Sequence, residues 1–162
     1  GKNRVYLIKS FKEINMEKGE RIEAMLPRWY IVTAVLLVAA LVMQIVPKST
    51  IMVFAGARGV ANVAAYSYFD FMHVGYGNWL FLLSGIATAA ALALSVVNIF
   101  KKNKKVGVGC SLCASGAFLL AGAGTFIFTA LTYLNALCWV TLGVLFLAAL
   151  SSFGPFIVMM KK

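Results

Sequence analysis

The sequence predicts an all-α membrane protein, a bundle of four transmembrane helices with room for a small β-hairpin in the first outer loop. Three observations predict this class. Of the 162 residues, 62% are hydrophobic and only 12% are charged, whereas soluble domains are about 45–50% apolar and about 25% charged. The apolar residues form long runs without charge, and the basic residues collect at the ends of these runs.

The uncharged runs give the predicted helices. A span needs roughly 20 apolar residues, because a helix rises about 1.5 Å per residue and the bilayer core is about 30 Å thick. The runs at 29–46 and 79–100 each match one helix. The uncharged stretch at 106–160 is too long for one span and too short for three. We therefore expect two helices there, at about 106–129 and 136–159, with a short polar turn between them.

The basic residues predict the orientation, because Lys and Arg near span ends favour the cytoplasmic side. Seven lie in residues 1–28, four in the 101–105 loop and two at 161–162, against two in the 47–78 loop. We expect a multi-pass protein of the cell membrane with both termini in the cytoplasm. The net charge of +10 then attracts anionic lipid headgroups on that side. The chain lacks the basic face with interleaved aromatics that binds nucleic acid.

The N-terminal segment 1–28 mixes basic and acidic residues. Ile8, Phe11 and Ile14 recur every three residues, a spacing that favours an amphipathic helix on the inner membrane face. We expect this segment to be cytoplasmic and residues 29–162 to be the four-helix transmembrane domain. The first apolar run is longer than a signal-peptide core and no small-residue cleavage pattern follows it, so we expect it to be retained.

The outer loop 47–78 is too long for a simple turn, and loops of this length are usually folded or functional. Residues 51–54 and 60–71 have the pattern of two extended strands, with Gly56 and Gly59 bracketing a turn. The aromatic residues that follow either bind a partner or form an interfacial belt. The candidate partner-binding residues are Tyr66, Tyr68, Phe69, Asp70, His73 and Tyr76.

Asp70 and His73 are the two residues of this loop that resemble metal ligands or proton carriers. A metal site needs three or four ligands, and the loop offers two. We therefore expect neither a metal nor a cofactor. For Asp70 we expect a local hydrogen bond or a pair with Arg58.

The sequence YSYFD at 66–70, followed by GYGN at 75–78 before an apolar helix, resembles a group of small multi-span membrane proteins of Firmicutes-type bacteria. The resemblance covers about residues 25–160. The group is uncharacterised, so the resemblance implies a bacterial membrane protein but no activity. Claudin-like tetraspans also combine four helices with a longer first outer loop. Their loop holds a Trp and a cysteine pair that this loop lacks, so that likeness is one of architecture.

Small residues recur at every fourth position in the third and second predicted helices. Such rows let helix backbones approach closely in lipid, where close packing replaces the hydrophobic drive. We expect these two helices to pack through the rows. Lining a narrow pore and docking another subunit are the alternatives. The expected packing residues are Gly85, Ala89 and Ala93 on the second helix and Gly109, Cys113, Ala117, Ala121 and Thr125 on the third.

The predicted spans offer little chemistry. No charged residue and no histidine lies within the apolar runs, although proton relays and ion-coupled transport use such residues. Cys110 and Cys113 form a C-x-x-C motif, but on the reducing cytoplasmic side. We expect no catalytic residues and no enzyme.

The function favoured by the sequence is a non-enzymatic accessory or scaffold protein. It would act through the outer aromatic loop or the small-residue helix faces, binding another membrane subunit or a second copy of itself as a homo-oligomer. One alternative is an oligomeric channel or passive carrier whose polar mouth is formed by Thr125, Thr129, Thr132 and Asn135. The other is a membrane thiol oxidoreductase that uses Cys110 and Cys113.

Overall fold

The computed structural model describes residues 2–55, 59–70, 79–129 and 133–160. Its helices are α1 (Lys2–Ile45), α2 (Trp79–Lys101), α3 (Lys104–Phe128) and α4 (Ala136–Met160), and strands β1 (Thr50–Ala55) and β2 (Ala61–Tyr66) lie between α1 and α2. Each helix holds a segment long and apolar enough to cross a membrane, namely Ala24–Ile45, Trp79–Lys101, Lys104–Ile127 and Ala136–Pro155. The predicted fold class, including the hairpin, is confirmed.

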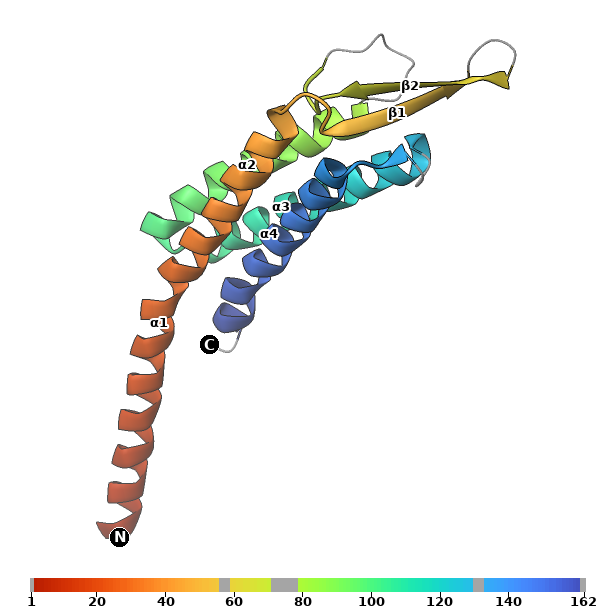
Figure 1. Cartoon of the computed structure of the whole chain (residues 1–162). Coiled ribbons are helices and arrows are strands. Elements are labelled where there is room, and N and C mark those ends of the chain that lie inside the picture. The colour runs from red at the N-terminus through yellow and green to blue at the C-terminus, as the bar shows by residue number, and fades with distance from the viewer. Residues whose placement is uncertain (1, 56–58, 71–78, 130–132, 161–162) are drawn as a thin grey trace.

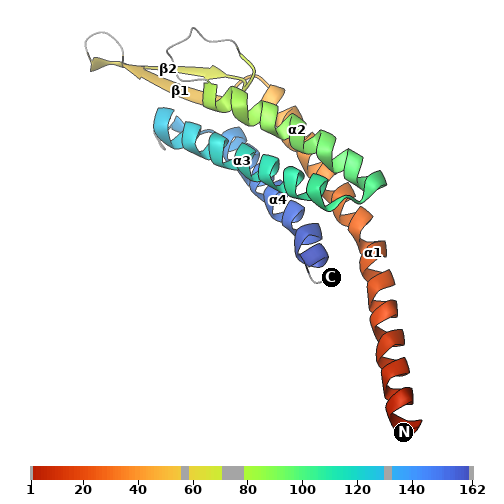
Figure 2. The ribbon, with the colours of Figure 1, turned by 180° about the vertical axis from the view of Figure 1, so that it is seen from behind.

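The helices form a ring in chain order. Helix α1 packs against α2, α2 against α3, and α3 against α4. Helix α4 also packs against α1, which closes the ring. The chain runs alternately up and down through the bundle (Figure 1). The hairpin consequently lies at one end of the bundle and both termini lie towards the other, as the reverse view also shows (Figure 2).

Helix α1 is much longer than a span. Its 44 residues extend about 66 Å at 1.5 Å per residue, and its N-terminal part runs on past the other helices (Figures 1 and 2). Pro27 lies inside the helix, where it removes one backbone hydrogen bond without ending it. The N-terminal segment is therefore helical and continuous with the first span, and its place on the inner membrane face stays a prediction.

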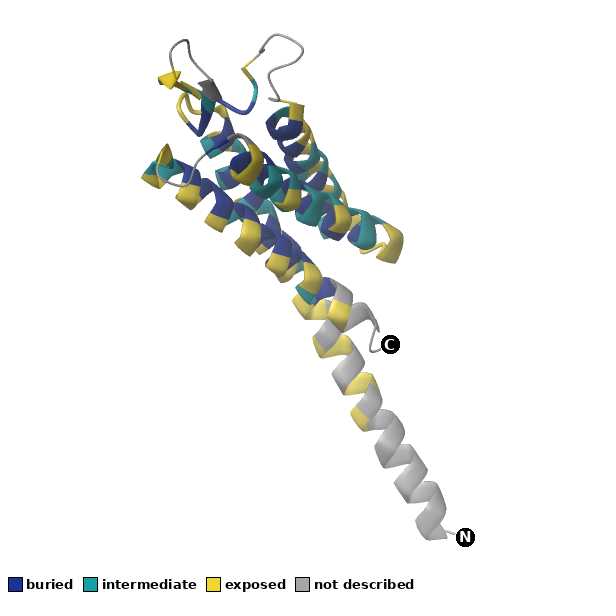
Figure 3. Ribbon diagram, turned by 90° about the vertical axis from the view of Figure 1, so that its right-hand side faces the viewer, coloured by how far each residue is buried: buried dark blue, intermediate teal, exposed yellow. Residues whose placement is uncertain are grey.

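The core is a thin column of small and apolar side chains along the bundle axis. Buried residues face inwards and exposed ones outwards on every helix (Figure 3). Large apolar side chains such as Val35, Leu119 and Ile127 are exposed on the outside, where lipid tails would solvate them. The fully buried apolar residues include Leu37, Ala40, Phe81, Ala91, Ala117, Ala121 and Ala148.

The buried face of α2 differs from the predicted row of small residues. Ala89 and Ala93 are exposed, so they do not pack against α3. Gly85, the third residue of the predicted row, is buried, but it faces the Phe69 ring. Apart from Gly85 and Leu80, the buried positions recur at alternating steps of three and four residues, the spacing of a coiled-coil seam. They are Phe81, Ser84, Thr88, Ala91, Ser95 and Asn98.

The predicted row on α3 lies closer to the observed interface. Ala117, Ala121 and Thr125 are buried, and Gly109 and Cys113 are half-buried. A Cβ atom added to Gly109 would lie 3.4 Å from the Leu94 side chain of α2, so this glycine does face α2.

Buried side-chain hydrogen bonds join each neighbouring pair of helices. Most of the donors are hydroxyl groups and most of the acceptors are backbone carbonyls, which polar side chains in lipid must find within the protein. The bonds are Ser95 Oγ to Tyr30 O (2.9 Å, α2 to α1), Ser84 Oγ to Ala117 O (2.7 Å, α2 to α3), Ser111 Oγ to Ser152 O (2.8 Å, α3 to α4) and a bond between Thr33 Oγ1 and Ser151 Oγ (3.0 Å, α1 with α4).

The close approach at Gly85 gives a test of the packing. A Cβ atom added there would lie 2.6 Å from Phe69 Cζ, whereas one added to Gly116 meets nothing within 4 Å. We expect Gly85→Leu to lower the free energy of unfolding in detergent by about 1–3 kcal/mol through overpacking. Gly116→Leu should leave it unchanged or raise it, because leucine favours helix over glycine by up to about 1 kcal/mol. Equal stability of the two variants would contradict this packing.

Candidate functional site

A two-stranded hairpin lies at the end of the bundle away from the termini (Figure 1). Its strands pair antiparallel, from Thr50 opposite Tyr66 to Ala55 opposite Ala61. Gly59 has a φ of 75°, a left-handed conformation that suits glycine at the turn. Gly56 lies outside the described residues. The predicted hairpin is thus present, and its two strands lie in the two predicted regions.

The second strand is shorter than the predicted run 60–71. It ends at Tyr66, and the chain turns at once because the Ser67 backbone N–H donates to Asp70 Oδ2 at 2.7 Å. This bond confirms the expected local hydrogen bond of Asp70. Arg58, the alternative partner, lies outside the described residues.

Three helix ends hold the hairpin in place. The carbonyl oxygen of Gln44, at the end of α1, accepts from the Tyr68 N–H at 3.0 Å and from Ser49 Oγ at 3.2 Å. The Thr129 hydroxyl, which follows α3, donates to the Ile51 carbonyl of β1. The hairpin is therefore bonded to the bundle just before β1, within β1 and just after β2.

Asn135 completes these attachments at the start of α4. Its side-chain oxygen accepts from the Cys138 N–H at 2.8 Å and its amide nitrogen donates to the Lys48 carbonyl at 3.1 Å. One side chain therefore caps α4 and ties it to the turn after α1.

Two aromatic candidates of the loop, Tyr68 and Phe69, face the bundle. Tyr68 is only 1% exposed, and its ring meets that of Phe81 edge-on with the ring centroids 5.0 Å apart. The half-buried Phe69 ring lies against Gly85. These two residues therefore anchor the loop. Tyr68 is too deeply buried to form a partner surface, and a partner role for the rest of the loop stays a prediction.

The remaining loop candidates are placed as follows. Asp70 is exposed and Tyr66 is half-buried, while His73 and Tyr76 lie outside the described residues. The exposed side chains of the hairpin come from its far end and from β2. Val60, at 65%, and Val63, at 46%, are the large apolar ones among them.

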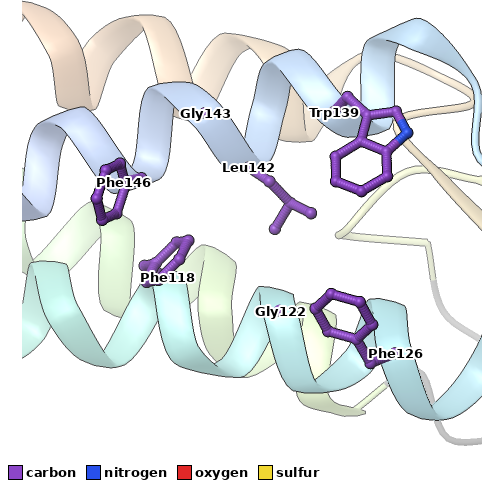
Figure 4. A pocket seen from close by; sticks show the side chains of 7 residues that line it. All are labelled: Phe118, Gly122, Phe126, Trp139, Leu142, Gly143 and Phe146. Carbon is purple, nitrogen blue, oxygen red and sulfur yellow. The ribbon is translucent and has the colours of Figure 1, made fainter.

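A groove of about 290 Å³ opens between the outer halves of α3 and α4. Figure 4 shows Phe118 and Phe146 at one end and Phe126 and Trp139 at the other, with Leu142 pointing between them. Gly122 and Gly143 also line the groove. A Cβ atom added to either glycine would meet no atom within 4 Å, so neither is needed for packing within the chain.

Several residues of the two alternative functions make hydrogen bonds within the protein, namely Cys110, Thr125, Thr129 and Asn135. Cys110 is buried and donates to the Ala91 carbonyl at 3.4 Å, and all three cysteines are free. Thr125 donates to the Ala121 carbonyl. Thr129 and Asn135 make the attachments described above, and Thr132 lies outside the described residues. The described part of the chain has no group of three or more potential metal ligands among His, Cys, Asp and Glu.

A polar cluster around Gln44 was not predicted from the sequence. Gln44 Nε2 donates to Ser84 Oγ at 3.3 Å and to Thr88 Oγ1 at 3.1 Å, within the bundle. Gln44 Oε1 is buried without a hydrogen-bond partner among the described atoms. The Gln44 amide itself could have indicated the cluster, because an amide in an apolar run is costly unless it is hydrogen-bonded.

Comparison of the chain with known protein families, with curated proteins and with solved structures found no match. The class of the protein therefore follows from its fold. Four helices long and apolar enough to span a membrane make it a multi-pass integral membrane protein.

Tyr68 gives a pH-dependent test of the anchored loop. Burial raises the pKa of Tyr68 above its ordinary value, and a Coulombic interaction with Cys138 adds to the shift. Unfolded tyrosine ionises near pH 10, so stability is lost as the pH rises above about 10. We expect the free energy of unfolding in detergent to fall by about 1 kcal/mol more in the wild type than in Tyr68→Phe between about pH 10 and pH 11. Parallel curves for the two proteins would show that Tyr68 is not buried.

Proposed function

We propose that this chain is a non-enzymatic accessory or scaffold protein of a cell membrane, which binds a transmembrane helix of another membrane protein. The helix would lie in the groove between α3 and α4 and meet the hairpin at its outer end. The observation that carries this proposal is the groove itself, with two glycines that no side chain of the chain covers.

The lining of the groove suits a helix as its occupant. Glycines let a second backbone approach closely, and close packing is the main attraction between helices in lipid. The aromatic rings beside Gly122 and Gly143 would supply the walls. Strand β1 contacts both α3 and α4, so the hairpin lies beside the two helices that form the groove.

The uncharged spans support a binding role over a transport or catalytic one. No Asp, Glu, Lys, Arg or His lies in 29–46, 79–100 or 106–160, and intramembrane residues of these types are the usual carriers of coupled transport. The bundle axis is filled by fully buried side chains such as Leu37, Phe81 and Ala121. The fold supports an oligomeric channel and a thiol oxidoreductase less well for these reasons, and we do not propose either.

The orientation proposed from the basic residues places the hairpin outside the cytoplasm. The positive segments 1–28, 101–105 and 161–162 would then share the cytoplasmic side, beside anionic headgroups.

Leucine substitutions in the groove test the partner proposal. Gly143→Leu and Gly122→Leu fill the space that the partner helix would use, whereas Gly116→Leu adds the same side chain to an equally open position of α3 outside the groove. We expect each groove variant to reduce co-purification of the partner from mild detergent at least tenfold, and Gly116→Leu to leave it intact.

Helix content by circular dichroism verifies that the three variants fold. Unchanged co-purification from both groove variants would overturn the proposal. If the partner recovered with the wild type is a second copy of this chain, the groove is a homo-oligomer interface instead.

Cysteine labelling tests the orientation. Asn62 on β2 and Lys105 at the start of α3 are both exposed, and they lie at opposite ends of the bundle. An impermeant thiol reagent applied to intact cells should label Asn62→Cys and not Lys105→Cys. The reverse pattern would place the termini outside.

A further inference from the structure

A second groove lies on α1, at the opposite end of the bundle from the hairpin. It has a volume of about 180 Å³ and its described lining comes from Met25, Arg28, Trp29 and Val32. These positions are separated by three, four and seven residues, so they form one face of the helix. An otherwise apolar groove thus contains one cation.

Trp29 is fixed in position by α4. A Cβ atom added to Gly154 would lie 3.0 Å from two atoms of the indole, so the ring lies directly on this glycine. Trp29 remains 37% exposed. The indole therefore forms a firm wall of the groove with one face still open.

Arg28 is exposed and has no partner among the described side chains. The one ion pair among them joins Arg21 to Glu17 at 2.8 Å, two turns nearer the N-terminus. Among the described side chains, the Arg28 guanidinium group is thus unpartnered, and it lies beside an apolar surface. Guanidinium binds phosphate through two parallel hydrogen bonds.

The depth of Arg28 matches the lipid headgroups. The apolar segment begins at Ala24, and four residues correspond to roughly 6 Å. Side chains on a helix lean towards its N-terminus, which here is the membrane surface. The long arginine side chain can therefore reach the headgroup level while its stem stays on the apolar face.

We infer that this groove binds an anionic phospholipid. The phosphate group would lie against the Arg28 guanidinium, and one acyl chain would run along Trp29 and Val32. The complementarity of charge selects an anionic lipid, and the apolar remainder of the lining selects a lipid over free phosphate. The site depends on membrane insertion but not on the partner role of the α3–α4 groove.

The test uses the full chain reconstituted in lipid vesicles, with Trp29 as the reporter. Trp79→Phe and Trp139→Phe remove the other two tryptophans, both of which are more than half exposed. Quenching of Trp29 is then compared between phosphatidylglycerol and phosphatidylcholine that carry brominated acyl chains. We expect phosphatidylglycerol to be preferred about fivefold, the effect of one basic residue at an anionic surface.

Two arginine variants separate a defined site from diffuse attraction. Arg28→Gln should abolish the preference, and Arg21→Gln, which removes the same charge from the same helix, should retain it. A preference that survives in Arg28→Gln, or that falls equally in both variants, would overturn the proposal. Equal quenching by the two lipids in the parent protein would do the same. The assay contains no other protein, so loss of the partner proposal would not affect its result.

Discussion

A polar group buried among lipid-facing helices has no water to bind, and this constraint organises the bundle. A hydroxyl in the core is costly unless it bonds to the same helix or to the next one, and among the described hydroxyls only Tyr30 and Ser115 are buried without a partner. In this chain every neighbouring pair of helices is joined by such a bond, for example by Ser95 between α2 and α1 and by Ser111 between α3 and α4. Each bond contributes modestly in a membrane, about 0.6 kcal/mol on average. These hydrogen bonds matter more for specificity, because they fix which helix faces meet. Apolar packing alone would allow several arrangements.

Gln44 connects this internal network to the outer element. Its amide nitrogen bonds to α2 inside the bundle, and its backbone carbonyl accepts from Ser49 and Tyr68 outside it. The hairpin is therefore an extension of the bundle and not a separate loop. A partner helix that enters the α3–α4 groove would meet a surface whose position is already set, which reduces the entropy lost on binding.

The number and order of the helices could be predicted from the sequence, because span length and the cost of charge in lipid decide them. The full length of α1 could not, because its helix continues through the charged segment that precedes the span, and neither could the buried faces. Ala93 and Ala91 look alike in an apolar run, yet one is exposed and the other buried. In lipid both faces of a helix are apolar, so periodicity loses its usual meaning. The polar residues carried the better signal, since the seam of α2 follows Ser84, Thr88, Ser95 and Asn98. The groove could not be predicted, because it depends on glycines whose neighbours only a three-dimensional structure reveals. The inward direction of Tyr68 could not be predicted either, because it depends on the turn after β2.

The continuity of α1 has a mechanical consequence. A helix that passes through Pro27 without ending links the N-terminal segment to the span as one rod. About 22 residues of α1 precede the apolar segment, or roughly 33 Å of helix. A change of about 10° in the tilt of the span would swing the far tip by roughly 6 Å, according to the same helical rise. Events that tilt the bundle, such as occupation of a groove on one flank, would thus displace the N-terminal end of α1.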